Sequence, residues 1–134
     1  MRRLPHTGQA RLPGRVVRFE PNRQVTAERS LAAGDSCLNE TGRLPSVLLV
    51  ELMAQVSGLL IDDAGSAPGD YAVLAGIKRM HLHDTALAGE TVEVSGTLSR
   101  RLGDLYLVDC RARSATRELA HGSLQIRRVR GKRS

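Results

Sequence analysis

The spacing of hydrophobic and polar residues changes several times along the chain and predicts its elements. Two short strand-like runs, residues 16–19 and 24–27, flank the turn-forming Glu20-Pro21-Asn22, a pattern typical of a β-hairpin. A polar loop follows over residues 32–43. Later in the chain the pattern favours strands again. The four strand segments are residues 71–83, TVEVSGTL at 91–98, LYLVDCRA at 105–112 and GSLQIRR at 122–128, the last three separated by turns at 102–104 and 115–118.

The most apolar stretch, GRLPSVLLVELMAQVSGLLI at residues 42–61, lies between the hairpin and the later strands. Pro45 suits the first position of a helix, and Ser46 is a capping residue type. Apolar residues occupy almost every side of this helix, which is typical of a buried central helix. One such helix and a single antiparallel sheet can cover each other. We therefore expect an α+β fold in which the sheet wraps around the helix, with an open sheet edge that favours a dimer.

A narrow polar line interrupts this apolar helix. Glu51, Gln55, Gly58 and Asp62 recur at helical spacing, so they share one side of the cylinder. The line either faces a wet gap or polar backbone, or borders a cavity where the polar end of a substrate meets an apolar channel. In the second interpretation, burial would keep the Glu51 carboxyl protonated and ready to donate its proton.

The helix segment resembles a known enzyme family. RLPSVLLVELMAQVSGLL is similar to the central helix of the hotdog-fold 3-hydroxyacyl-[acyl-carrier-protein] dehydratases, approximately P-G-V-L-x-x-E-A-M-A-Q-x-x-G. LAGI at residues 74–77 and GE at 89–90 match a downstream segment of that family. LPHTG at residues 4–8 resembles its L-P-H start and the opening of dehydratase-like proteins from aryl-polyene pathways. The resemblance implies a hotdog fold over nearly the whole chain.

The resemblance also implies the roles of individual residues. In the family, a loop histidine removes the proton alpha to the thioester, and the helix carboxylate of another subunit protonates the departing 3-hydroxyl. Glu51 corresponds to this acid, and Gln55 to a supporting polar residue. Ser46, at the helix N-terminus, is expected to help bind the thioester carbonyl. The remaining predicted substrate contacts are Val47 and Gly76.

The family histidine stands fourteen residues before the glutamate, and Cys37 occupies that position here. A thiol at its usual pKa is mostly protonated at pH 7, and apolar burial would raise its pKa further. A neighbouring cation or the nearby helix N-terminus would instead lower it. Cys37 is therefore either an altered catalytic partner of Glu51 or a small side chain that fills a buried volume.

Other histidines could in principle take the place of the missing base, but we expect other roles for them. His6 lies in the family-like opening, and the family pattern places the strand of His121 away from the site. His81 and His83 alternate on one face of a predicted strand, together with Arg79. Two such histidines can chelate a metal ion, but no third ligand is evident near them. We therefore expect this pair to face solvent or a carrier protein, and we expect neither a metal nor a cofactor.

The net charge of +6 is concentrated at the C-terminus. Five basic residues lie there, and removing them leaves 15 basic against 14 acidic residues. With one Phe and two Tyr for stacking, the chain lacks the pattern of a nucleic-acid-binding protein. We expect one domain over residues 1–126 and a flexible basic tail over 127–134, which could also meet an acidic carrier protein. The five residues are Arg127, Arg128, Arg130, Lys132 and Arg133.

No secretory signal opens the chain, and the apolar run 47–61 is too short and too interrupted to span a bilayer. The expected location is the cytoplasm, with no membrane partner. Three functions remain open. The chain is a dehydratase of acyl-carrier or CoA thioesters in fatty-acid or polyketide/polyene synthesis, with Cys37 in place of histidine. Alternatively, it is a non-catalytic hotdog subunit that pairs with a catalytic dehydratase. The third function is an acyl thioesterase in which Glu51 acts as base or nucleophile.

Overall fold

The N-terminal hairpin forms as predicted. The computed structural model describes residues 14–62 and 69–131, and its first two strands, β1 (Arg15–Glu20) and β2 (Gln24–Ser30), pair antiparallel. Pro21 fixes one backbone angle of the turn, and Asn22 adopts a φ of 59°, a left-handed conformation that Asn tolerates. The remaining elements are α1 (Ser46–Asp62), β3 (Tyr71–Leu82), β4 (Thr91–Leu102), β5 (Leu105–Arg113) and β6 (Glu118–Val129).

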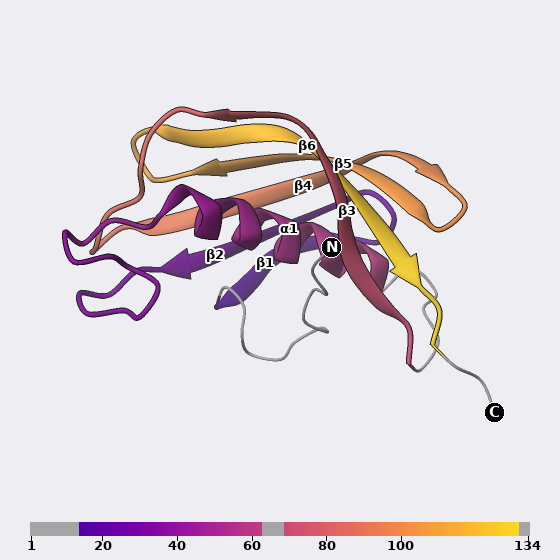
Figure 1. The fold of residues 1–134 in the computed structure, drawn as a ribbon, viewed down its shortest axis with the longest axis horizontal. Coiled ribbons are helices and arrows are strands. Elements are labelled where there is room, and N and C mark those ends of the chain that lie inside the picture. The colour runs from indigo at the N-terminus through magenta and orange to yellow at the C-terminus, as the bar shows by residue number, and fades with distance from the viewer. Residues whose placement is uncertain (1–13, 63–68, 132–134) are drawn as a thin grey trace.

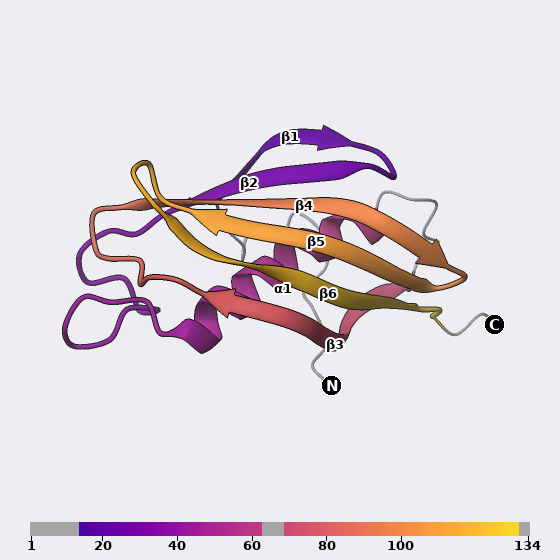
Figure 2. The same cartoon turned by 90° about the horizontal axis from the view of Figure 1, so that it is seen from above.

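The six strands form one antiparallel sheet in the order β1-β2-β4-β5-β6-β3 (Figure 2). β4, β5 and β6 follow one another as the predicted meander requires. β3 does not belong to that succession, because it pairs with β6 at the sheet edge while β4 pairs with β2. The prediction of four meander-like strands is wrong for β3. An alternating pattern specifies the two faces of a strand but not which strand pairs with it. Residues 83–90 also form a longer connection than a tight hairpin, so β3 and β4 need not be neighbours.

The helix α1 lies across one face of the curved sheet, so that the sheet covers it as expected for an α+β hotdog fold (Figure 1). Its residues Met53, Ala54 and Val56 are completely buried, and Tyr106 and Ile126 meet them from the sheet side of the core. In the part of the chain that the structure describes, no helix is both long and apolar enough to cross a membrane.

The beginning of α1 differs from the prediction. Pro45 precedes the helix instead of occupying its first position, and its carbonyl oxygen accepts bonds from the amides of Leu48 at 3.0 Å and Leu49 at 3.1 Å. The first turn is also not buried in the single chain, because 69% of Val47 is exposed. The sequence marked α1 as apolar all round, but one side of its beginning remains uncovered by the sheet.

The C-terminal segment is not a tail from residue 127 onward. Residues 127–129 belong to β6, and only 5% of Arg128 is exposed. Arg128 and Arg130 both bind the carboxylate of Asp104, with closest distances of 3.1 and 3.0 Å. The amide of Gly131 donates to Asp70 at 2.8 Å. The predicted boundary at residue 126 is therefore wrong, because β6 continues to Val129 and ion pairs hold Arg128 and Arg130 against the domain. Residues 132–134 lie outside the described part.

Candidate functional site

A small pocket beside the beginning of α1 brings together three of the predicted site residues, Cys37, Glu51 and Gln55. Glu51 and Gln55 stand one turn apart on the helix, and both are half-buried. The pocket has a volume of about 140 Å³, well below the several hundred Å³ of a typical ligand site. This single-chain pocket is therefore too small to enclose a typical ligand completely. The other lining residues are Arg29, Leu31, Leu44, Leu48 and Leu52.

The predicted polar line on the helix continues only in part. Glu51 and Gln55 face the pocket, whereas Gly58 is buried in the core. The side chain of Asp62 lies outside the described residues. Glu51 is half-buried and not fully buried as the apolar pattern predicts, because the pocket opens beside it. The interpretation in which these two polar residues border a cavity agrees with this geometry.

The loop before α1 holds Cys37 in a hydrogen-bonded network with two residues that the sequence did not single out. The Cys37 thiol donates to Asp35 Oδ1 at 3.0 Å, and the Cys37 amide donates to the same oxygen at 3.1 Å. Arg29 Nη2 donates to both Asp35 oxygens at 3.0 Å and lies 3.6 Å from Cys37 Sγ. An Asp two residues before another residue commonly accepts its amide in this way, which is the signal in the sequence for Asp35.

This network sets the charges in the pocket wall. Burial raises the pKa of the Cys37 thiol, and the hydrogen bond to Asp35 raises it further, while Arg29 acts in the opposite direction. The bonds donated by the Cys37 thiol and amide, together with Arg29, lower the pKa of Asp35 to about 2. At neutral pH the site therefore holds a protonated thiol beside a carboxylate–guanidinium pair. A protonated thiol is a poor proton acceptor, which weighs against Cys37 as the base.

The reactivity of Cys37 provides a first prediction. Asp35→Asn removes the negative charge beside the thiol and leaves Arg29 in place, so the pKa of Cys37 should fall. Each pKa unit makes the thiolate about tenfold more abundant, and we expect alkylation of Cys37 by iodoacetamide to become several-fold faster. Mass spectrometry after timed labelling measures the rate.

The second cysteine supplies the control for this experiment. Cys110 is buried, and its pKa is raised to about 12 by that burial. The Cys37→Ser chain should consequently resist labelling. If the Asp35→Asn chain is labelled no faster than the native chain, Asp35 does not retain the thiol proton.

The other predicted substrate contacts lie outside this pocket. Ser46 and Val47 are exposed at the open beginning of α1. Gly76 belongs to β3, and a Cβ atom there would lie 2.8 Å from Gln125 Oε1. Glycine at this position therefore makes room for Gln125. The structure does not bring Ser46, Val47 or Gly76 together with Glu51 in the single chain.

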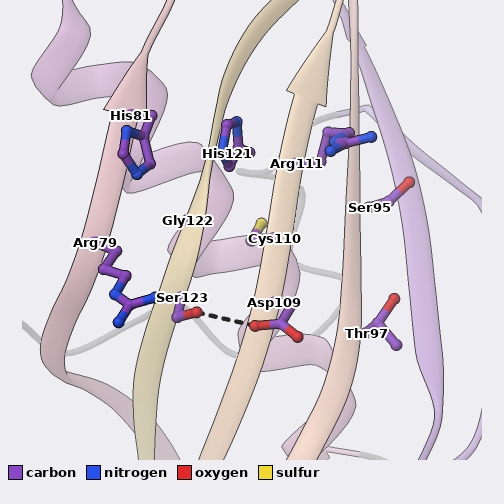
Figure 3. Close-up of a pocket in the computed structure, with 10 residues that line it drawn as sticks. All are labelled: Arg79, His81, Ser95, Thr97, Asp109, Cys110, Arg111, His121, Gly122 and Ser123. Atoms are coloured by element: carbon purple, nitrogen blue, oxygen red, sulfur yellow. Dashed lines mark hydrogen bonds between the residues drawn. The ribbon is translucent and has the colours of Figure 1, made fainter.

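The described histidines lie on the face of the sheet opposite to α1. His81 and His121 line an open groove of about 470 Å³ there, beside Arg79, Arg111 and polar residues of β4 and β5 (Figure 3). His83 contacts His121 from just beyond the end of β3. None of these three side chains reaches the pocket of Glu51, so they do not replace the family histidine within one chain. The position of His6 is outside the described residues.

A six-stranded antiparallel sheet around one central helix, with a helix carboxylate at a pocket, defines the class of hotdog-fold acyl-thioester enzymes. The chain belongs to the ApeP-like family, since the family model described as ApeP dehydratase matches residues 2–132. The Listeria welshimeri 3-hydroxyacyl-[acyl-carrier-protein] dehydratase FabZ is 28% identical over 104 residues, which cover 75% of this chain and 72% of that protein.

Two solved structures illustrate the similarity of the fold. The dehydratase heterocomplex ApeI:P from Xenorhabdus doucetiae matches with a TM-score of 0.78 and 19% identity, over 94% of this chain and 88% of that chain. A hypothetical thioesterase with coenzyme A from Streptococcus pneumoniae matches with a TM-score of 0.72 and 16% identity, over 90% and 88% of the two chains. These two likenesses concern the fold, and they agree with the architecture expected from the helix segment.

Proposed function

We propose that this chain is the acid-supplying subunit of a 3-hydroxyacyl-thioester dehydratase, and that a second hotdog chain supplies the base. The observation that carries the proposal is the pocket at the start of α1. It contains the carboxyl group of Glu51 and the protonated thiol of Cys37, and none of the histidines in residues 14–62 and 69–131 lines it. This composition supports a chain that supplies the acid of the family pair, with the base coming from another chain.

The reaction assigns a single proton transfer to Glu51. The partner's base removes the proton from C2 of the 3-hydroxyacyl thioester, and the electron pair of that bond forms the C2–C3 double bond. The C3–O bond breaks as the Glu51 carboxyl protonates the departing hydroxyl, which leaves as water. Gln55 lies one turn along α1 and supplies an amide that can hydrogen-bond the substrate. The reverse reaction, hydration of an enoyl thioester, returns the same proton to Glu51.

Two further observations support a second chain. Among the described strands, β1 and β3 are each paired on one side only, and an open sheet edge is a ready surface for pairing. The X. doucetiae structure, which has the same fold, is described as a dehydratase heterocomplex. The proposed substrate is an acyl chain carried as a thioester, either on an acyl carrier protein, which the FabZ relatives have in their name, or on coenzyme A.

Restoring the histidine tests the proposal. The native chain alone should hydrate a short 2-enoyl-CoA thioester slowly, and Cys37→His should raise turnover by about 10²-fold or more, the usual contribution of a positioned base. Loss of absorbance of the enoyl thioester measures the rate. Cys37→Ser is the matched control and should remain slow. A native chain that is fully active alone, and that loses activity in both variants, would show that Cys37 itself takes part.

A thioesterase is the second candidate, and the same pocket favours it. Glu51 faces the pocket without a histidine, and a carboxylate alone can activate water or attack a thioester. This function predicts release of free coenzyme A from saturated acyl-CoA, measured with a thiol reagent after protein removal. Release that disappears in Glu51→Gln would favour the thioesterase, whereas no release by the native chain would exclude it.

A further inference from the structure

Three histidines meet on the outer face of the sheet, where the sequence offered only a pair. The antiparallel register of β3 and β6 places His81 directly opposite His121. His83 follows one position after the end of β3, and its amide donates to the carbonyl of Leu119 at 2.8 Å. This bond fixes the backbone of His83 against β6. His83 therefore contacts His121, a possible metal ligand that lies nearly forty residues later in the sequence.

The ring nitrogens of His83 and His121 point at each other. His83 Nε2 lies 2.8 Å from His121 Nδ1, and the two rings are stacked with centroids 4.8 Å apart. Glu118 lies three positions before His121 on β6 and is the third member of this group of possible metal ligands. One donor atom from each of His83, Glu118 and His121 lies within 4.8 Å of the other two. His83 is exposed, whereas Glu118 and His121 are half-buried, so an ion can enter from solvent.

Glu118 already has a cationic neighbour, which a metal ion would have to replace. Its Oε1 atom is enclosed and has no aligned hydrogen bond among the described residues. Arg111 Nε approaches this oxygen to 2.7 Å as an ion pair. An enclosed carboxylate oxygen that has a cation beside it, but no aligned donor, is suited to bind a metal ion in place of the guanidinium.

The types of donor atom and the distances between them fit a transition-metal ion. Two imidazole nitrogens and one carboxylate oxygen form a common set for Zn²⁺, with bonds of about 2.0–2.2 Å and tetrahedral geometry. Tetrahedral ligands at such bond lengths stand roughly 3.3–3.5 Å apart. The His83–His121 nitrogens must separate and the Glu118 oxygen must approach, and rotation of the exposed His83 side chain allows the first of these movements. A water molecule can complete the fourth position.

We propose that His83, His121 and Glu118 bind one divalent transition-metal ion on the outer face of the sheet, on the opposite side from the pocket of Glu51. The ion links the residue that follows β3 to the first half of β6, and it competes with Arg111 for Glu118. The site departs from the expectation of no metal, which rested on the absence of a third ligand near His81 and His83. The fold brings two ligands to His83, namely His121 and Glu118, and His81 is not part of the set.

Calorimetric titration of the metal-stripped full chain with Zn²⁺ tests the site. We expect one ion per chain, and a higher thermal-unfolding midpoint when Zn²⁺ is present in excess. Removing a ligand, as in His83→Ala or His121→Ala, should weaken binding at least about 100-fold, because loss of a supporting outer-shell group alone costs 10–100-fold. Arg111→Met should strengthen binding, since it releases Glu118 from its ion pair.

His81→Ala is the matched control, because the His81 ring stacks on His121 at 4.9 Å but its nitrogens are outside the donor group. This variant should bind Zn²⁺ as the native chain does. Each histidine variant should also unfold at the native midpoint without metal, which separates lost ligation from lost folding. A native chain that takes up no Zn²⁺, or a His121→Ala chain that binds it as tightly as the native chain, would overturn the proposal.

Discussion

Replacing Glu51 by Gln in the Cys37→His chain is expected to lower hydration of a short 2-enoyl-CoA thioester by at least about 100-fold. A positioned general acid or base contributes roughly 10² to 10⁴-fold to such a reaction. The Gln side chain keeps the size of Glu51 and its position on α1, but it has no proton to exchange with the substrate oxygen. Initial rates at saturating and at low substrate concentration separate an effect on turnover from an effect on binding.

The control for this experiment is Gln55→Leu in the same background. Gln55 lies beside Glu51 in the pocket but exchanges no proton in the proposed reaction. Its replacement should raise the KM more than it lowers kcat, because it removes a substrate contact. If Glu51→Gln retains most of the activity while the chain stays folded, the central proposal about this pocket is wrong.

The largest expected effect on stability comes from Gly122→Ala. A Cβ atom at Gly122 would lie 2.2 Å from the carbonyl oxygen of Arg79 and 2.9 Å from Cα of Met80. Both are backbone atoms, and they sit at a β-bulge where Arg79 already adopts a φ of 63°. Neither can move without breaking the pairing of β3 with β6. We expect the free energy of unfolding to fall by about 3 kcal/mol or more.

Urea unfolding with linear extrapolation measures this change. The adjacent variant Ser123→Ala is the control, because it removes only an exposed hydrogen bond to Asp109 and should cost about 1 kcal/mol or less. If the free energy of unfolding of Gly122→Ala lay within about 1 kcal/mol of the native value, the backbone of β3 could move away from the new methyl group at little cost.

The elements were predictable because their signals are local. Alternation, turn residues and the apolar run at residues 42–61 place every strand and the helix within a few residues of their observed ends. The place of β3 in the sheet was not predictable, because its pairing with β6 depends on contacts between residues some fifty positions apart. The same limit hid the metal-ligand group, since His121 and Glu118 meet His83 only through that pairing.

In the candidate site, too, local spacing predicted some features, whereas features that depend on contacts distant in sequence were missed. The spacing of Glu51 and Gln55 on a helix predicts that they share a side, and they line one pocket with Cys37. The network around Cys37 was missed, because Arg29 on β2 reaches Asp35 only after the loop folds back on the strand. The basic residues near the C-terminus were misjudged for a similar reason. Arg128 finds its partner, Asp104, in the turn between β4 and β5, which composition does not reveal.

The small volume beside Glu51 has a consequence for water. A space of about 140 Å³ has room for several water molecules, since one needs only about 10–15 Å³. In the proposed reaction, water is a product in one direction and a reactant in the other, so the same space that receives C2 and C3 of the substrate must also retain one water molecule near the Glu51 carboxyl. A substituent on C3 that fills this space would bind well and still block hydration. Under the proposed function, the size of the pocket would therefore select substrates by the room they leave for water as well as by the fit of the acyl chain.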